Sequence, residues 1–227
     1  MMSYLKQEEK KEFIFLTLTA PNVSAADLND EIKIYNHSFK KLMERREVKG
    51  AVKGYVRKLE ITYNQERDDY HPHFHVLIVV NKSYFTDIKQ YITHNRWLEL
   101  WQEVTQNPLI TQVDVRKVYN GRDNKVFEIA KYSAKDSDYL INQEVFEVFY
   151  KALKSKRLIV YSGLFKNAMT KFKNGELDCY KEKDITKYVY AIMYNWGGKK
   201  YIEFEKRYLS EEELNEINNK FIEEKEE

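Results

Sequence analysis

Three histidines recur at every second position in one stretch of the chain. His71, His73 and His75 lead into the apolar run 76–80, so we expect a β-strand, in which alternate side chains share a face. Neutral imidazoles that converge on one point most often bind a divalent metal ion. The alternative is that the three histidines decorate an exposed edge strand. His71 lies nearer to the turn, where it either supports the ligands or is simply solvated.

An acidic residue on the neighbouring strand completes the expected metal site. Residues 51–63 are predicted to form a strand that pairs with the histidine strand in an antiparallel hairpin, across the polar turn 64–69. Glu60 lies in the apolar part of this strand, where a carboxylate needs a partner. Together with His73 and His75 it forms a mixed nitrogen and oxygen set, which suits Mn²⁺ or Mg²⁺ at an open site better than a closed structural zinc site.

A second group of reactive residues lies on a helix predicted over about 125–139. Glu128 and Tyr132 are four residues apart and Lys135 follows three later, so the three side chains share one face. Such a stripe is usually a solvated helix face. It also matches the cleavage of a phosphodiester by tyrosine. The phenol, with a pKa near ~10, needs a polarised phosphate or a nearby cation; the ammonium can stabilise charge on the phosphate, and the carboxylate can activate water in a second step.

The overall composition favours a folded intracellular protein. The chain has 227 residues, of which 15% are aromatic, with only seven Gly and three Pro, so we expect a packed α+β or α/β globule rather than a disordered chain. The single cysteine, Cys179, excludes an internal disulfide and is consistent with a reducing compartment. No apolar run reaches the length of a membrane span, and residues 1–6 lack a signal-peptide core. We therefore expect a cytoplasmic protein.

Basic residues gather in one stretch, although the net charge of +2 alone does not indicate a nucleic-acid binder. The stretch 40–58 is either a solvated helix face with its turn or a set of contacts to DNA phosphates. The candidates for phosphate contacts are Arg45, Arg46, Lys49, Lys53, Arg57 and Lys58.

The remaining hydrophobic patterns indicate an α+β fold with a core and an elaboration. The core is expected at 1–140, and a helical and hairpin elaboration, in the same or a closely packed domain, at 141–227. The further predicted elements are strands at 13–19 and 111–119, a helix capped by Ser24 that ends near Gly50, helices at 96–101, 144–154 and 163–174, a hairpin of 186–195 and 200–208, and a helix with Ser210 and Glu213 in a capping box.

These residues resemble a known family. The strand 15–19, the segment 72–78 with its two histidines separated by one apolar residue, and the segment 132–135, with a tyrosine three residues before a lysine, occur in the order of the three motifs of the HUH endonuclease superfamily. The stretch from Phe13 to about Gly198 resembles the replication initiators of small Gram-positive rolling-circle plasmids.

The resemblance implies a central five-stranded antiparallel sheet flanked by helices, with a divalent metal on the sheet face. It implies that such an initiator binds the plasmid's double-strand origin and nicks one strand at an extruded hairpin. The protein then stays joined to the 5′ end through a tyrosine and leaves a 3′-hydroxyl as primer. Host helicase, DNA polymerase and a second copy of the chain are further expected partners, and a membrane is not. By this correspondence His73, His75 and Glu60 are the metal ligands, Tyr132 is the nucleophile, Glu128 activates water for the terminating cleavage, and Lys135 is the lysine of the tyrosine motif.

Two other classes of protein stay open, while a third, a metal-binding cupin-like oxygenase, is disfavoured by the few glycines and the many predicted helices. One is another enzyme of the superfamily, a transposase or a mobilisation relaxase; relaxases usually show three histidines, so His71 leaves room for that interpretation. The other is a non-catalytic DNA-binding regulator of replication that keeps a degenerate nuclease fold. A metal-dependent nicking assay separates the enzymes from the regulator.

Overall fold

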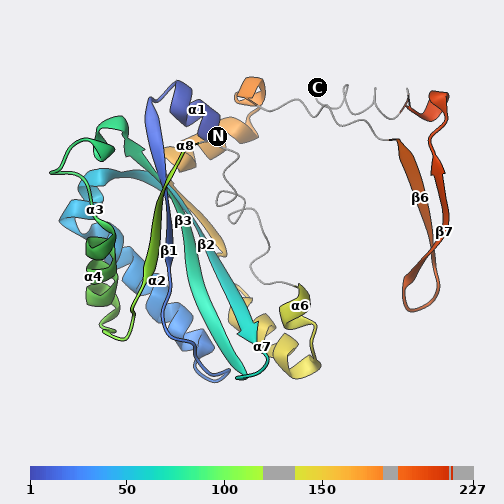
Figure 1. Ribbon diagram of the computed structural model, residues 1–227, viewed down its shortest axis with the longest axis horizontal. Helices are drawn as coiled ribbons and strands as arrows, with labels where there is room; N and C mark the ends of the chain where they lie inside the picture. Colours follow the sequence, from blue (N-terminus) through green and yellow to red (C-terminus); the bar gives the residue numbers. More distant parts are fainter. Residues whose placement is uncertain (120–135, 181–188, 215, 217–227) are drawn as a thin grey trace. The chain divides into compact units, whose positions relative to one another are not determined.

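The computed structural model describes residues 1–119, 136–180, 189–214 and 216, which Figure 1 draws as ribbon. The chain divides into two compact units, Met1–Tyr180 and Lys181–Glu227, and each is described by itself. The helices are α1 (Met2–Gln7), α2 (Leu28–Glu44), α3 (Arg46–Ala51), α4 (His94–Thr105), α6 (Asp136–Tyr139), α7 (Gln143–Leu153) and α8 (Leu164–Lys173). The strands are β1 (Lys11–Leu18), β2 (Val52–Asn64), β3 (Asp69–Asn81), β4 (Val113–Val118), β5 (Ile159–Gly163), β6 (Tyr190–Trp196) and β7 (Tyr201–Tyr208), and short 3₁₀ helices cover Lys82–Phe85 and Asp178–Tyr180.

The first unit is built on a five-stranded sheet in the order β4-β1-β3-β2-β5, in which all neighbouring strands are antiparallel. Helices flank this sheet, so the predicted α+β class with a five-stranded antiparallel sheet is confirmed (Figure 1). The histidine strand β3 lies in the centre, paired with β1 on one side and β2 on the other. The exposed-edge alternative for the histidines is therefore wrong.

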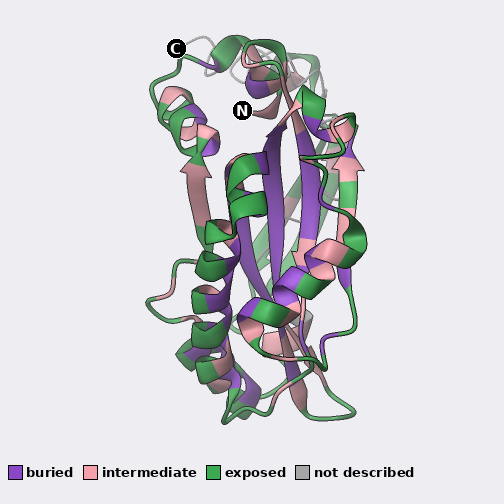
Figure 2. Cartoon of the chain, turned by 90° about the vertical axis from the view of Figure 1, so that its left-hand side faces the viewer, coloured by how far each residue is buried: buried purple, intermediate pink, exposed green. Residues whose placement is uncertain are grey.

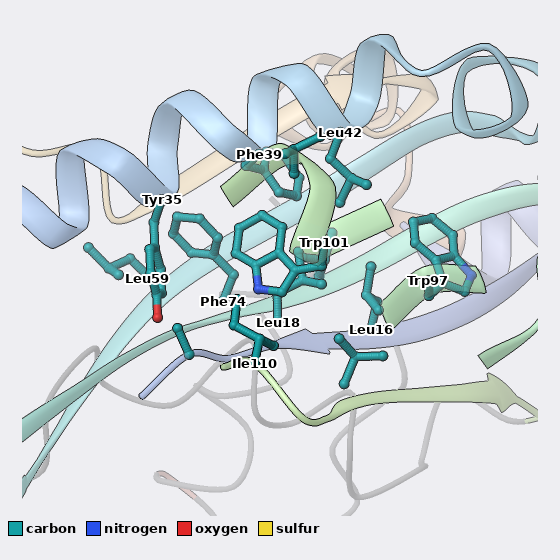
Figure 3. Packing of buried hydrophobic residues seen from close by; sticks show 14 of the residues in the cluster. Leu16, Leu18, Tyr35, Phe39, Leu42, Leu59, Phe74, Trp97, Trp101 and Ile110 are labelled. Carbon is teal, nitrogen blue, oxygen red and sulfur yellow. The ribbon is translucent and has the colours of Figure 1, made fainter. Parts of the chain in front are cut away.

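Alternation along β3 divides the core between the two faces of the sheet. Phe74, Val76 and Ile78 join the larger hydrophobic cluster, which includes residues of α2, α4 and α7. Figure 3 shows part of this cluster, and Figure 2 shows that the central strands of the sheet are mostly buried while the helices expose one side. Leu77 and Val79 point to the other face and pack in a smaller cluster with α1 and α8. The histidines at 73 and 75 continue this second face.

Two local predictions for the first helical region are wrong. Ser24 does not cap the helix, because α2 begins at Leu28 with Asp27 as its N-cap residue, while Ser24 accepts from the backbone of Asp27 in the preceding turn. The helix also does not continue to Gly50. Arg45 adopts a ψ of 134°, which interrupts the helical path and separates α2 from α3.

The fifth strand, β5, lies beyond residue 140 and pairs with β2. Helix α8 follows it directly and contacts β2, β5 and α1. The limit expected at residue 140 therefore falls inside the first unit, and segments on both sides of it build the same sheet and its covering helices.

The second unit contains the antiparallel hairpin of β6 and β7, which confirms the predicted hairpin over its described residues. The predicted capping box is present, since the backbone N–H of Ser210 donates to Glu213 and the backbone N–H of Glu213 donates to the Ser210 hydroxyl. Of the helices described, none has both the length and the apolar character needed to cross a lipid bilayer.

Candidate metal centre

The register of three adjacent strands brings the candidate ligands together. On β2 and β3, Glu60 is paired with His73 and Lys58 with His75. On the other side of β3, Thr17 of β1 is also paired with His75. Paired residues of antiparallel strands point to the same face. The hairpin register therefore places a carboxylate, an ammonium, a hydroxyl and two imidazoles on one face of the sheet.

The ligand atoms of Glu60, His73 and His75 converge. The Nε2 atoms of the two histidines lie 3.1 Å apart, and Nε2 of His75 lies 3.2 Å from Oε2 of Glu60. One ligand atom from each residue lies within 4.8 Å of the others, and all three residues are buried. Within the described ranges this is the only such group of three or more His, Cys, Asp or Glu residues. Two nitrogens and a carboxylate oxygen at this spacing fit a divalent cation that keeps open coordination positions.

The contacts of the two Nδ1 atoms leave Nε2 of His73 and Nε2 of His75 directed at the place where the three candidate ligands converge. Nδ1 of His73 lies 3.2 Å from the carbonyl oxygen of His71. Since a carbonyl only accepts, Nδ1 carries the proton and Nε2 keeps its lone pair. Nδ1 of His75 lies 3.3 Å from the hydroxyl of Thr17, which can donate or accept and so holds the orientation of the ring without fixing its tautomer. Such outer partners fix the tautomer and orientation of metal-binding histidines.

The electrostatic setting keeps the ligands ready for a cation at neutral pH. Burial raises the pKa of Glu60, but the hydrogen bond with His75 and the charge of Lys58 outweigh it and bring the pKa down to about 2. Nζ of Lys58 lies 3.1 Å from the carboxylate, and its side chain is fully buried. Burial and the neighbouring His75 lower the pKa of His73 to about 4. The carboxylate is thus ionised and the His73 imidazole neutral.

His71 supports His73 instead of joining the ligands. Its ring stacks on that of His73 with centroids 5.2 Å apart, and a hydrogen bond with the backbone of Ala20 holds it. It is half-buried and does not belong to the converging group. The stacking on His73 and the partial burial favour the interpretation in which His71 supports the candidate ligands, and the role of His71 stays a prediction.

Two of the predicted DNA-contact residues are buried. Arg57 places its guanidinium 4.3 Å from the ring centre of Phe74 and donates to Asn36 at 2.7 Å, while Lys58 pairs with Glu60 on the opposite face. The burial of Arg57 and Lys58 argues against direct contacts of these two side chains with DNA phosphates, because β2 is covered on both faces at these positions. The set of DNA-contact residues stays a prediction. The other four candidates lie nearer the surface: Arg45, Arg46 and Lys49 are exposed and Lys53 is half-buried.

The predicted nucleophile helix falls outside the described part of the chain. Glu128, Tyr132 and Lys135 belong to the undescribed range 120–135, and the description resumes at Asp136 with α6. Their roles stay predictions.

Sequence reasoning missed Thr17 and did not place Lys58 beside Glu60. Both residues carried the signal that identified Glu60, a polar side chain within an apolar strand. Lys58 is two residues from Glu60 and so shares its face.

Comparisons with known proteins bear on the family. A family model described as "Replication protein" matches residues 1–202. The chain belongs to this replication protein family. A "Protein rep" from Staphylococcus aureus is 62% identical over 143 residues, which cover 63% of this chain and 62% of that protein. A "Protein rep" from Streptococcus pneumoniae serotype 2 is 35% identical over 183 residues, which cover 76% of this chain and 57% of that protein.

A third relative is similar over more of its own length. A "Replication protein" from Staphylococcus aureus is 27% identical over 217 residues, which cover 87% of this chain and 92% of that protein. By contrast, the chain spans about three fifths of the length of the first two relatives. No solved structure matches it. The predicted membership of the Rep replication proteins is confirmed.

Proposed function

We propose that this chain is a plasmid replication initiator that nicks one strand of the double-strand origin by tyrosine transesterification. The observation that carries the proposal is the convergence of Glu60, His73 and His75 on the central strands of the sheet, in a member of the replication protein family. Replication of a circular plasmid needs a primer end, and a nick supplies a 3′-hydroxyl without any other enzyme.

The three ligands would hold a divalent cation, Mn²⁺ or Mg²⁺. When bound, the cation supplies Lewis acidity to a non-bridging oxygen of the scissile phosphate. The residues of the chain do the rest. The carboxylate of Glu60 stays ionised beside Lys58, and His73 presents Nε2 because its Nδ1 proton is bonded to a carbonyl oxygen.

The nucleophile in this proposal is Tyr132. Its phenolic oxygen loses its proton and forms a bond to phosphorus; the bond to the 3′-oxygen breaks, and that oxygen gains a proton. The 5′ end stays joined to the protein as a phosphotyrosyl ester, which conserves the bond for later religation. Lys135 would stabilise the charge on the phosphate, and Glu128 would activate water for the terminating cleavage.

The covalent link is the test. Wild-type protein, supercoiled plasmid with the origin and Mn²⁺ should give a protein–DNA adduct on denaturing gels and a free 3′-hydroxyl at one position. Tyr132→Phe should bind the origin and form no adduct. The matched control, Tyr150→Phe on the exposed surface of α7, should form the normal amount. An undiminished adduct with Tyr132→Phe would exclude this residue as the nucleophile.

The position of His71 favours an initiator over a three-histidine relaxase. Its ring supports His73 and does not join the converging group, so the expected ligand set has two imidazoles. Cleavage of oligonucleotides with a hairpin origin, and not of oligonucleotides with a transfer origin, would support the initiator. A wild-type protein that binds the origin and never nicks it would point to the regulator instead.

A further inference from the structure

The hairpin of β2 and β3 has its turn at one end and a strongly basic pocket at the other end. The pocket has a volume of about 730 Å³ and lies between α3, the start of β2, the end of β3 and the first turn of α4. Figure 1 shows α3 and α4 as neighbours, and Arg96 of α4 donates to Glu47 of α3 at 2.7 Å. The charged residues of its lining are Arg45, Arg46, Lys53, Lys89, Arg96 and Glu47.

The cations of this pocket differ in how far they are neutralised. Arg96 donates to three carboxylates, so it serves as a fixed frame. One of these carboxylates, that of Glu103, also lies 3.4 Å from the guanidinium of Arg45. The side chains of Arg46 and Lys89, by contrast, make no ion pair with a carboxylate among the residues that the structure describes, although the backbone N–H of Lys89 donates to Asp87. Nζ of Lys53 donates to a backbone carbonyl. Uncompensated positive charges held around one hollow favour an anionic ligand.

The lining indicates which anion fits. Guanidinium, ammonium and the amides of Asn81 and Gln90 are the groups that contact phosphate oxygens along a nucleic-acid backbone. Among the described residues that line the pocket, none is aromatic, so none offers a ring on which an unpaired base could stack. The chemistry therefore favours the phosphates of a duplex over an unstacked single strand.

The pocket is well separated from the metal centre. Lys53 precedes Glu60 by seven residues on β2, and Asn81 follows His75 by six residues on β3. At about 3.3 Å per strand residue this is roughly 20 Å. One phosphate cannot occupy both places, and 20 Å corresponds to about six base pairs along the axis of a DNA duplex.

We propose that this pocket binds the phosphate backbone of the duplex that flanks the nick, while the metal centre takes the unpaired strand that is cut. The proposal rests on the proposed function and adds a second, duplex-specific contact to it. It also assigns Lys89, which lies outside the basic stretch 40–58.

The test removes two charges from the pocket of the full chain. Arg46→Gln combined with Lys89→Gln is compared with Lys33→Gln combined with Lys151→Gln, which removes two exposed charges from α2 and α7. Each protein is titrated with an origin fragment that carries a duplex stem, over a range of salt. Each is also assayed with Mn²⁺ on a single-stranded oligonucleotide that carries the nick site.

We expect the pocket variant to bind the duplex fragment roughly 50-fold more weakly at 0.1 M salt, with a salt slope reduced by about two, as for two lost phosphate contacts. Its cleavage of the single-stranded oligonucleotide should match the control. Unchanged duplex affinity and an unchanged salt slope would overturn the proposal. An equal loss of duplex affinity and of single-strand cleavage would overturn it as well. If the wild-type protein cuts no DNA, the proposed function fails, but the duplex titration still tests the pocket.

Discussion

Removing the ammonium group of Lys58 should destabilise the metal-free protein by about 3 kcal/mol, because it strands the carboxylate of Glu60 in the interior. Both side chains are almost inaccessible, 0% and 6% exposed, and the charged atoms lie 3.1 Å apart. At an effective dielectric constant near 20 their attraction is about 5 kcal/mol. His75 still contacts the carboxylate at 3.2 Å in the variant, so we expect a loss at the lower end of the range for a broken buried pair.

A double-mutant cycle measures this directly. Urea unfolding in EDTA would be compared for wild type, Lys58→Met, Glu60→Gln and the double variant. The double variant should be more stable than Lys58→Met by at least about 1 kcal/mol, because no buried charge is left without a partner. The matched control is Lys33→Met. Lys33 lies 2.7 Å from Asp30, but both side chains are mostly exposed, so its loss should be under about 1 kcal/mol.

Repeating the unfolding measurements with Mn²⁺ tests the same ion pair in a second way. A bound cation stabilises the folded state, and here it would also replace the ammonium as the counter-charge of Glu60. The stabilisation by Mn²⁺ should therefore be larger in Lys58→Met than in wild type. A loss below about 1 kcal/mol for Lys58→Met in EDTA, or a double variant no more stable than the single one, would refute the reasoning that Lys58 compensates this carboxylate.

Three further outcomes are expected. Thr17→Val, which removes the hydroxyl beside Nδ1 of His75, should weaken Mn²⁺ binding about tenfold in calorimetry, and Thr17→Ser should restore it; equal affinity in all three proteins would contradict an orienting role. Burial lowers the pKa of His73 from 6.5 to about 4, so between these pH values the unfolded chain takes up a proton that the folded chain does not. The free energy of unfolding in EDTA should therefore fall as the pH falls from about 6.5 to 4, and it should fall less in His73→Gln. Arg57→Met should cost about 1–3 kcal/mol in urea unfolding, since it removes the guanidinium packed on Phe74, and should leave the salt slope of DNA binding unchanged.

The convergence of the candidate metal ligands could be predicted from the sequence because one physical rule decides it. Side chains alternate along a strand, so His73 and His75 had to share a face. The short polar turn between β2 and β3 then fixed the pairing, and Glu60 came to lie beside His73. An error of one residue in this register would have turned the carboxylate to the other face of the sheet.

The alternation of side chains along β2 also applies to Arg57 and Lys58, but the prediction of phosphate contacts followed from their charge and not from their positions on the strand. Arg57 and Lys58 are charged, and charged residues are seldom buried without a partner. The partners of Arg57, the ring of Phe74 and the side chain of Asn36, come from other elements of the fold. The partner of Lys58 is the carboxylate of Glu60, two residues away on the same face of β2. Local sequence gives no direct measure of such compensation.

The fifth strand was missed because its signal is weak. Ile159–Gly163 has five residues, is only partly buried and shows no clear alternation of apolar and polar residues. Its place is decided by pairing with β2, where Gly54 lies opposite Gly163. A side chain at Gly54 would meet the backbone of Ser162 and Leu164 at 2.6 Å, and Gly163 has a φ of +52°. This close approach is a tertiary requirement that neither segment shows alone.

The charges around the ligands favour an anionic substrate over a neutral one. Glu60 contributes one negative charge, Lys58 one positive charge, and the His73 imidazole is neutral at pH 7. The carboxylate is thus already compensated before a metal binds. A divalent cation would leave about two positive charges in a partly enclosed place, where opposite charges attract more strongly than in water. A phosphodiester supplies the missing negative charge, whereas a site with three carboxylates would be neutral or negative and would repel it. Under the proposed function, the buried Lys58 would therefore reduce the affinity for the metal and increase the attraction for phosphate. The opposite signs of these two effects in Lys58→Met separate this explanation from one in which the lysine only fills space.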